Sequence, residues 1–411
     1  MKNARCFLPA LAASALLLFT FACGGGSSSS QNSSGTGTST TANTVPVSVN
    51  VGPSGVYAYT NGVFVSVEVC KPGTGTCVTV PNVLLDTGST GLRLLSDTVS
   101  SLGLSNTTSG GQTIANCVQY LDNTYNWGPV ATADIKMAGE TASAVPIQII
   151  AEPDYTFPAA PASCGGTPND TLDTLLANGI LGVNFVLQDC GTYCAPGTTS
   201  NPGNYYSCTS SSCTVTTVPV AQQLQNPVAL FATDNNGVIL ALDAVPAAGA
   251  VTGSGTLTFG IGTQSNNTLG SATVLTTDDY GNIATKFGNT TTDVGFIDSG
   301  STALFFLTSA LTGLPECADD NSFYCPASTE SLSATNSGSN GANSTVNFSV
   351  ANADNLLNST NDAFSNLAGP GTDPSIGTYF DWGLPFFYGR SVYVAFVGAN
   401  AGGTTGPYWA Y

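Results

Sequence analysis

Short apolar or alternating runs, bounded by Gly, Asn and Pro, recur from Val45 almost to the last residue. Runs of this length and spacing predict β-strands. Helical periodicity is confined to two short segments, 172–177 and 353–357. We therefore expect an all-β body of about twenty short strands. The clearest strand candidates are 63–69, 83–85, 147–150, 238–242, 256–259 and 392–396.

Polar low-complexity stretches interrupt or precede this pattern. Residues 328–345 and 358–375 are rich in Ser, Asn, Thr and Gly, which predicts surface insertions. Residues 24–44 contain no charged residue and almost no apolar one, so they cannot bury enough surface to fold and are expected to form a flexible tether.

The first 23 residues have the pattern of an export signal. Lys2 and Arg5 precede an apolar run at 7–21 that is short for a membrane span. Ala22-Cys23 followed by Gly and Ser is similar to a bacterial lipoprotein cleavage site, which predicts lipidation of Cys23. The alternative is ordinary signal cleavage nearby, with loss of Cys23. With lipidation, the protein would be exported and anchored at the cell surface, on the outer membrane or periplasmic side if the cell has two membranes.

The charge composition excludes several function classes. The chain has 7 Lys and Arg against 25 Asp and Glu, no His, and a formal net charge of -18. So few basic residues cannot neutralise a run of phosphates, so we expect no nucleic-acid partner. Without His there is no Ser-His-Asp catalysis and no His zinc ligand. The remaining chemistry rests on carboxylates, hydroxyls and thiols, and we expect neither a cofactor nor a metal.

Ten of the 12 cysteines lie beyond Cys23, an even number that in an exported chain predicts up to five disulfides. The close pairs Cys70/Cys77 and Cys317/Cys325 suit the two sides of a hairpin or loop. The connectivity within 190–213 stays open. A metal site is the competing interpretation, but the spacings lack His and a repeated Cys-x-x-Cys.

Two segments repeat one pattern: an apolar strand, then Asp, a hydroxyl residue, Gly and two more hydroxyl residues. They are 83–90, which contains Asp86, and 295–302, which contains Asp298. Such a turn places a carboxylate at a loop tip beside N–H and O–H donors. If the two loops meet, the carboxylates share one proton and can act as general base and general acid without His or metal. One such motif alone would be only a strand-ending turn.

These two motifs resemble those of the pepsin-like aspartic peptidases, in which each of two β lobes supplies one Asp. The resemblance covers about residues 55–411. It implies an all-β, two-lobed fold with a cleft between an N-terminal lobe (45–230) and a C-terminal lobe (231–411). It also implies an extended peptide as the partner in the cleft and a monomer. Further landmarks follow in the family's order: 125–128 with 134–139, 179–182, 255–262, 382–387 and 392–396.

The resemblance implies a role for each motif residue. Asp86 and Asp298 would form the catalytic dyad, supported by close backbone approach at Gly88 and Gly300. Thr87 and Ser299 would lock the two loops together, and Ser89 and Ser301 would bond the outer carboxylate oxygens. Tyr125 would be the aromatic residue of the flap over the substrate, with Trp127 as substitute. The alternative interpretation is that Tyr125 is an ordinary aromatic residue of a hairpin core.

Three departures from the family pattern bear on activity. Arg93 stands where the family usually has Trp, and it is either a cation beside the dyad that lowers its pKa values or an outward surface charge. The flap hairpin is short between Tyr125 and Asp134. Asp381 precedes Trp382-Gly383 where an apolar residue is expected. The phrases 86–93 and 383–390 also resemble an uncharacterised family of bacterial surface lipoproteins.

We thus expect an aspartic-type endopeptidase that hydrolyses peptide bonds through a two-Asp dyad and an activated water at the cell surface. The alternative is a catalytically inactive pepsin-like binding or structural lipoprotein that kept the loops because they hold the lobes together. A third class, an adhesive or matrix protein with two incidental motifs, would have Asp86 and Asp298 far apart.

Overall fold

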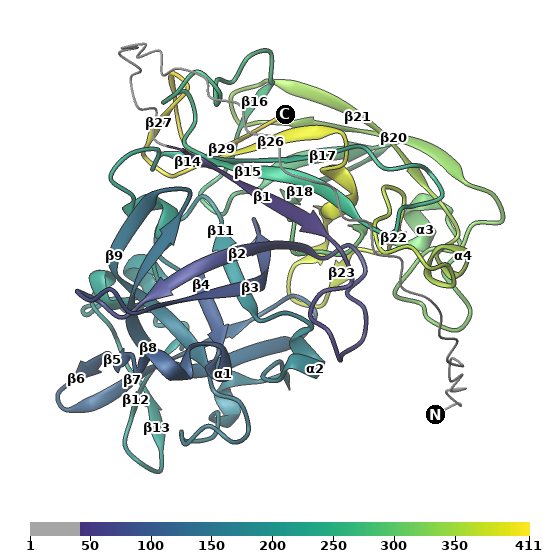
Figure 1. Ribbon diagram of the computed structural model, residues 1–411. Helices are drawn as coiled ribbons and strands as arrows, with labels where there is room; N and C mark the ends of the chain where they lie inside the picture. The colour runs from purple at the N-terminus through teal and green to yellow at the C-terminus, as the bar shows by residue number, and fades with distance from the viewer. Residues whose placement is uncertain (1–41) are drawn as a thin grey trace, which may run out of the picture. The chain divides into compact units, whose positions relative to one another are not determined.

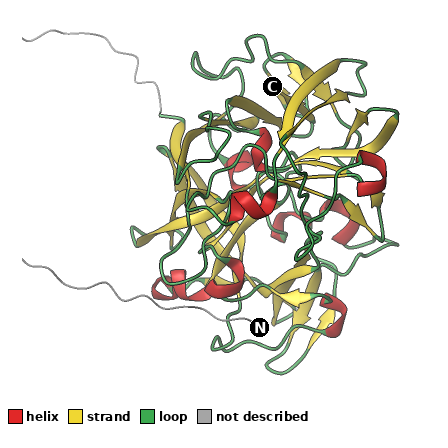
Figure 2. Ribbon diagram, turned by 90° about the vertical axis from the view of Figure 1, so that its right-hand side faces the viewer, coloured by secondary structure: helices red, strands yellow, loops and turns green. Residues whose placement is uncertain are grey.

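Strands follow the apolar runs throughout residues 42–411, the part of the chain that this computed structural model describes. Each strand candidate from the sequence overlaps a strand, and the two helical segments overlap α2 and α4. The helices are short turns beside a framework of strands (Figure 2). Among the described residues, no helix has the length and hydrophobicity needed to cross a membrane. The predicted signal, Cys23 and residues 24–41 of the predicted tether lie outside this range; β1 begins at Thr44.

The strands of the first half are β1 (Thr44–Val49), β2 (Val63–Cys70), β3 (Cys77–Asp86), β4 (Thr90–Leu95), β5 (Ser105–Asn106), β6 (Thr108–Ser109), β7 (Gln112–Gln119), β8 (Thr124–Met137), β9 (Glu140–Ile150), β10 (Thr167–Pro168), β11 (Gly179–Val183), β12 (Tyr205–Cys208) and β13 (Cys213–Val215). The strands of the second half are β14 (Gly237–Leu242), β15 (Gly253–Phe259), β16 (Val274–Thr276), β17 (Ile283–Phe287), β18 (Thr290–Ile297), β19 (Leu304–Phe306), β20 (Glu330–Ser337), β21 (Asn343–Val350), β22 (Ala368–Gly369), β23 (Thr372–Asp373), β24 (Gly377–Thr378), β25 (Phe380–Trp382), β26 (Arg390–Ala395), β27 (Asn400–Ala401), β28 (Thr404–Thr405) and β29 (Tyr408–Ala410). The α-helices are α1 (Ser96–Val99), α2 (Leu172–Leu175), α3 (Ser309–Thr312) and α4 (Ala353–Leu357), and the 3-10 helices are η1 (Ser100–Leu102), η2 (Ala162–Cys164), η3 (Gly191–Cys194), η4 (Val220–Gln222), η5 (Pro227–Leu230) and η6 (Leu384–Phe386).

Three sets of pairings organise these strands. In the first half, β2, β3, β11, β4, β9 and β8 pair in that order and β8 returns to β2, which closes a barrel. In the second half, β21, β20, β17, β18, β25, β19 and β22 form an open sheet. Strands of both halves join in the order β2, β1, β15, β14, β26, β29 and β16 (Figure 1). The predicted boundary between lobes at 230/231 stays a prediction.

The same three-stranded unit occurs once in each half. In the first, β11 lies between β3, to which it is parallel, and β4, to which it is antiparallel. In the second, β25 lies between β18 and β19 with the same directions. Gly182 is the residue before the last of β11, and Gly383 directly follows β25. A Cβ on Gly182 would lie 2.6 Å from the carbonyl carbon of Ser89, and one on Gly383 would lie 2.0 Å from the carbonyl oxygen of Ala303, so neither position has room for a side chain. Each unit therefore presses the loop that follows its first strand against the end of its central strand.

The core is apolar and continuous around these units. Leu85, Val183, Ile297 and Trp382 have no exposed surface, and they belong to one cluster that spans both halves. Burying a side chain of this size contributes about 1.5 to 3 kcal/mol. The loops that follow β3 and β18 thus stand on rigid, fully buried strands.

The five expected disulfides are present, and the pairs Cys70–Cys77 and Cys317–Cys325 are confirmed. The connectivity left open by the sequence is Cys190–Cys194 and Cys208–Cys213, and the fifth bridge is Cys117–Cys164. A sulfur in a disulfide is not a thiolate, and the thiolate is the form that binds metal ions. The five bridges therefore account for these ten cysteines in place of the competing interpretation, a metal site.

The prediction of two surface insertions needs correction. Residues 328–345 are largely exposed but regular, since β20 and the first residues of β21, 343–345, pair there in a hairpin at the sheet edge. The prediction for 358–375 is wrong in its central part, where Phe364 and Leu367 are fully buried and β22 pairs with β19. Two polar residues of this part, Asp362 and Asn366, are themselves buried, and Asn366 donates to the carbonyl of Ala247, so polar composition does not indicate exposure here.

Candidate active site

The loops after β3 and β18 meet, and they bring Asp86 and Asp298 together. A Cβ placed on Gly88 would lie 2.6 Å from the carboxyl carbon of Asp298, and one on Gly300 would lie 2.8 Å from Oδ1 of Asp86. Each carboxyl group therefore packs against the glycine of the opposite loop, where only a residue without a side chain fits. The expectation attached to an adhesive or matrix protein, that the two Asp lie far apart, is wrong.

Thr87 and Ser299 join the two loops through four buried hydrogen bonds. The Thr87 N–H donates to Oγ of Ser299 at 3.1 Å, and the Ser299 N–H donates to Oγ1 of Thr87 at 2.9 Å. The same hydroxyls donate onward, Thr87 to the Ile297 carbonyl at 2.9 Å and Ser299 to the Leu85 carbonyl at 2.7 Å. Each loop donates one backbone N–H and one hydroxyl to the other, and these bonds fix the two loops relative to each other.

The two carboxyl groups differ in the donors that surround them. Asp86 accepts bonds from the N–H of Gly88 at 2.7 Å, the N–H of Ser89 at 3.2 Å and the Ser89 hydroxyl at 2.5 Å. Asp298 accepts only two, from the Gly300 N–H at 2.7 Å and the Ser301 hydroxyl at 3.1 Å. Because donors stabilise the ionised form, this difference favours the charge on Asp86 and the proton on Asp298.

Desolvation acts in the same direction. Asp298 is half-buried, and desolvation by the protein packed around it raises its pKa well above the usual range. The charge of Asp86 raises the pKa further, followed by the charge of Asp381. Two close carboxyl groups of this kind hold one proton between them at moderately acidic pH.

A third carboxyl group, Asp381, lies beside this pair. It occupies the centre of β25 and is 2% exposed. Burial raises the pKa of Asp381 well above the usual range, and the charge of Asp86 adds to this effect. The sequence marked Asp381 only as a departure from an apolar position, because neither its motif nor its spacing indicates proximity to Asp298.

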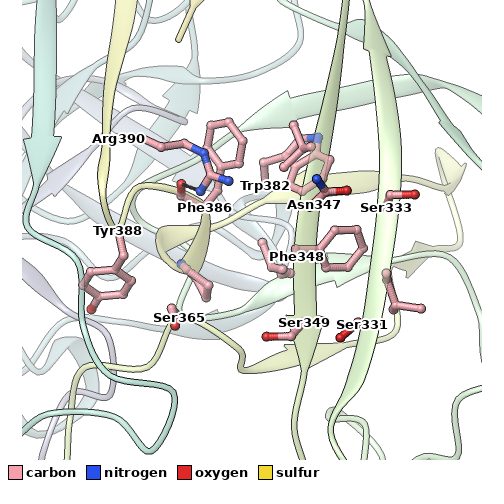
Figure 3. A pocket seen from close by; sticks show the side chains of 14 residues that line it. Ser331, Ser333, Asn347, Phe348, Ser349, Ser365, Trp382, Phe386, Tyr388 and Arg390 are labelled. Atoms are coloured by element: carbon pink, nitrogen blue, oxygen red, sulfur yellow. Dashed lines mark hydrogen bonds between the residues drawn. The ribbon is translucent and has the colours of Figure 1, made fainter.

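The opposite face of β25 is apolar, since successive side chains of a strand point to opposite sides. Trp382 packs there against Phe380 and Phe386. Trp382, Phe386 and Arg390 border a cavity of about 540 Å³ (Figure 3). Arg390 lies over the Phe386 ring and donates to its carbonyl at 2.6 Å. Asp381 is thus the polar residue of a strand whose neighbours are aromatic.

Arg93 is not a surface charge, since its side chain is fully buried on β4. It forms an ion pair with Asp189 at 3.4 Å and donates to the Thr90 carbonyl at 2.7 Å. Burial nevertheless raises the pKa of Asp189, although Arg93, Tyr205 and Asn116 all stabilise its carboxylate. The lowering of the dyad's pKa values that a nearby cation would cause is not found at Asp298, whose pKa is raised.

The two aromatic candidates on the β7–β8 hairpin, Tyr125 and Trp127, pack in one cluster with Tyr206. Trp127 is 4% exposed, donates its indole N–H to the Pro158 carbonyl and packs against Tyr206. Tyr125 is half-buried beside the same cluster, and the one charge that raises its pKa, after burial, is that of Asp170. Their assignment to the flap stays a prediction.

The charge of Asp86 affects two other tyrosines, Tyr120 and Tyr59. Tyr120 begins the turn at the hairpin end and donates its hydroxyl to Asn126 at 2.7 Å. Burial raises the pKa of Tyr120, Arg93 opposes the rise and Asp86 adds to it. Burial raises the pKa of Tyr59, and the charges of Asp86 and Asp298 raise it further. The Asp-Asn pair at 122–123 is the sequence signal that would have placed this turn, and Tyr120 with it. In the structure Asn123 has the positive φ that such a turn uses.

Residues 39–411 match a family described as "Protein of unknown function (DUF3443)". The chain belongs to this family. No curated protein matches the sequence. Among solved structures, the aspartic proteinase from Irpex lacteus is similar, with a TM-score of 0.50 and 18% identity over 90% of this chain and 96% of that one. This likeness confirms the expected all-β, two-lobed, pepsin-like fold.

Proposed function

We propose that the protein is an aspartic-type endopeptidase that hydrolyses peptide bonds of an extended peptide or protein substrate. The observation that carries this proposal is the contact between the carboxyl groups of Asp86 and Asp298, each packed against the glycine of the opposite loop. The aspartic proteinase activity named for the similar solved structure supports it by analogy of fold.

In this proposal a water molecule lies between the two carboxyl groups. Ionised Asp86 takes a proton from the water molecule while the water oxygen attacks the peptide carbonyl carbon. At the same time Asp298 gives its proton to the carbonyl oxygen. The resulting tetrahedral diol then breaks its C–N bond while the proton held by Asp86 passes to the leaving nitrogen and one hydroxyl proton returns to Asp298. A free carboxyl group and a free amine result, and the dyad regains its starting state.

The proposed setting is the cell exterior. Five disulfides are typical of exported proteins. A lipid at Cys23, followed by the uncharged segment 24–41, would anchor the catalytic body to a membrane while leaving it free to meet substrates. We propose that the body acts there as a monomer.

The test is digestion of an unfolded protein mixture from about pH 3 to about pH 7, with products identified by mass spectrometry. We expect new internal termini that form fastest in acid, that form equally with a metal chelator present, and that disappear in Asp298→Asn. A folded, fully oxidised protein that cleaves nothing at any pH would contradict the proposal. It would favour the pepsin-like binding or structural module, in which the loops serve only to hold the halves together.

A further inference from the structure

The cavity of about 540 Å³ beside Trp382 is formed by segments of the second half of the chain. Most of its walls come from the β20–β21 hairpin, from β25 with η6, and from Arg390, the first residue of β26 (Figure 3). No residue of the loops that carry Asp86 and Asp298 lines it. Cavities of this size commonly hold small organic ligands. The cavity is therefore a candidate binding site in its own right, separate from the proposed dyad.

One wall of the cavity is aromatic. The Trp382 ring packs edge-to-face against Phe348, with ring centres 5.4 Å apart, and its centre lies 5.1 Å from that of Phe386. Trp382 and Phe386 are buried, whereas Phe348 is half-buried. Leu332, the register partner of Phe348 in the hairpin, is also half-buried and lines the cavity. An apolar ring that enters the cavity would therefore meet packed aromatic and aliphatic side chains.

Arg390 is the cation of the cavity, and two contacts hold its guanidinium group. The group lies over the Phe386 ring, 4.7 Å from the ring centre, and donates to the Phe386 carbonyl at 2.6 Å. Figure 3 shows the side chain directed from β26 toward the β20–β21 hairpin, across the cavity. A guanidinium group has several N–H donors in a fixed fork, so the bond to Phe386 leaves donors for a ligand.

No carboxylate within residues 42–411 forms an ion pair with Arg390, although the chain has 25 Asp and Glu. Arg93, the other arginine of this range, pairs with Asp189. Asp243 lines a neighbouring hollow together with Arg390, but its carboxylate accepts the Ser254 hydroxyl at 2.6 Å instead. Burial lowers the pKa of Arg390, and no carboxylate of the described range opposes this effect. An anion from solution would supply the missing counter-charge.

The polar lining of the cavity selects the kind of anion. It includes Asn347, Ser349 and Ser365, whose side chains form no hydrogen bond with the described part of the protein and can donate to a ligand oxygen. No second Lys or Arg lines the cavity. One guanidinium group with neutral donors matches a singly charged carboxylate. A doubly charged phosphate would leave one charge uncompensated in a chain whose net charge is already -18.

We propose that this cavity binds a small aromatic carboxylate, whose carboxylate pairs with Arg390 and whose ring packs beside Phe348 and Leu332. The Phe386 ring and carbonyl hold Arg390 in place before the ligand arrives, so this side chain loses little conformational freedom on binding. The inference uses no catalytic role of Asp86 or Asp298. It therefore stands or fails independently of the proposed function.

The first test is a titration of the wild-type protein, labelled with nitrogen-15 in its Trp indoles, with 3-phenylpropanoate at neutral pH. The chain has 3 Trp, and the Trp382 indole signal is assigned through Trp382→Phe. We expect this signal to shift and saturate with a Kd of about 1 mM or tighter. The signals of Trp127 and Trp409, which do not line the cavity, should stay in place. No shift of the Trp382 signal at about 10 mM probe would overturn the inference.

The second test compares ligands on the wild-type protein and so needs no variant. The neutral analogue 3-phenylpropanamide keeps the ring but loses the charge, and we expect it to bind at least about tenfold more weakly than the acid. Inorganic phosphate, which has no ring, should also bind at least about tenfold more weakly. Equal binding of the acid and the amide would overturn the pairing with Arg390, and tighter binding of phosphate would overturn the choice of an aromatic carboxylate.

The third test removes the cation. Arg390→Gln should weaken binding of 3-phenylpropanoate at least about tenfold, and Arg390→Lys, which keeps the charge but not the fork, should have an intermediate affinity. The matched control is Lys71→Gln, which removes an exposed cation outside the cavity and should bind as the wild type does. Unchanged Trp127 and Trp409 signals verify that each variant is folded. Wild-type affinity in a folded Arg390→Gln protein contradicts the proposed site.

Discussion

Thr87 and Ser299 exchange backbone N–H bonds with each other's hydroxyl groups, at 3.1 Å and 2.9 Å, although they come from loops in opposite halves of the chain. Both residues are fully buried. A buried donor that loses its partner keeps the full cost of desolvation, so this exchange makes each loop depend on the other. The separation of Asp86 from Asp298 is therefore set by contacts one residue away from the carboxyl groups.

Replacing Thr87 tests this dependence. Thr87→Val keeps the shape of the side chain but leaves the Ser299 N–H and the Ile297 carbonyl without their partner. We expect the free energy of unfolding to fall by about 2 to 4 kcal/mol in denaturant titration. Thr108→Val, on an exposed strand, should change it by about 0.5 kcal/mol or less. Equal effects of the two substitutions would contradict the structural role given to the exchange.

Gly88→Ala separates catalysis from stability. The new methyl group would lie 2.6 Å from the carboxyl carbon and Oδ2 of Asp298, so that side chain must move. We expect kcat/KM to fall about 100-fold, with a change of about 1 kcal/mol or less in the free energy of unfolding. Gly75→Ala, where an added Cβ meets nothing within 4 Å, is the matched control and should retain activity. Full activity in Gly88→Ala would mean that the carboxyl contact is not needed.

The buried carboxyl groups predict greater stability in acid than at neutral pH. The pKa values of Asp298, Asp381 and Asp189 are raised by burial above the usual 3.8. The folded protein thus retains protons that the unfolded chain releases. Their stabilising contribution is complete below about pH 4 and is lost as pH rises toward the folded-state pKa values.

The measurement is denaturant unfolding at several pH values between about 4 and 8. We expect the free energy of unfolding to decrease with pH, by about 1.4 kcal/mol per pH unit for each proton retained. The slope should be shallower in Asp381→Asn, which has one such group fewer. A free energy of unfolding that rises steadily over this range would refute the assignment of raised pKa values.

We expect substitutions of Tyr120 and Tyr125, both near the end of the β7–β8 hairpin, to affect KM differently. Tyr120→Phe removes the donor to the buried Asn126, which frees the turn that faces Asp86. We expect KM for peptide substrates to rise about threefold to tenfold. Tyr125→Phe should leave KM within about twofold. A larger effect at Tyr125 would instead support the role that the sequence suggested for it.

The sequence predicted those parts of the site that a local pattern encodes. The two Asp-hydroxyl-Gly turns follow apolar strands, and turn chemistry with strand alternation is readable over a few residues. The pairing of Cys70 with Cys77 was predictable for the same reason. The contact that joins the two turns, the exchange of hydrogen bonds between Thr87 and Ser299, came from the family resemblance rather than from periodicity.

The parts that the sequence did not predict depend on contacts between distant segments. Asp381 lies near Asp298 because β25 inserts between β18 and β19. Arg93 could not be assigned inward or outward, since its partner Asp189 lies far along the chain. Segment 358–375 looked like a surface insertion because its composition is polar, yet Asn61 bonds the backbone of Phe364 from the other half and holds it inside.

The central claim is that Asp86 and Asp298 act as one catalytic pair, and the most direct measurement is the cleavage rate of Asp86→Asn at the pH of highest wild-type activity. The account predicts a loss of about 1,000-fold or more in kcat, with all five disulfides formed and the free energy of unfolding changed by about 1 kcal/mol or less. Retention of activity within about tenfold of the wild type would contradict the account, since hydrolysis would then not depend on the ionised member of the pair.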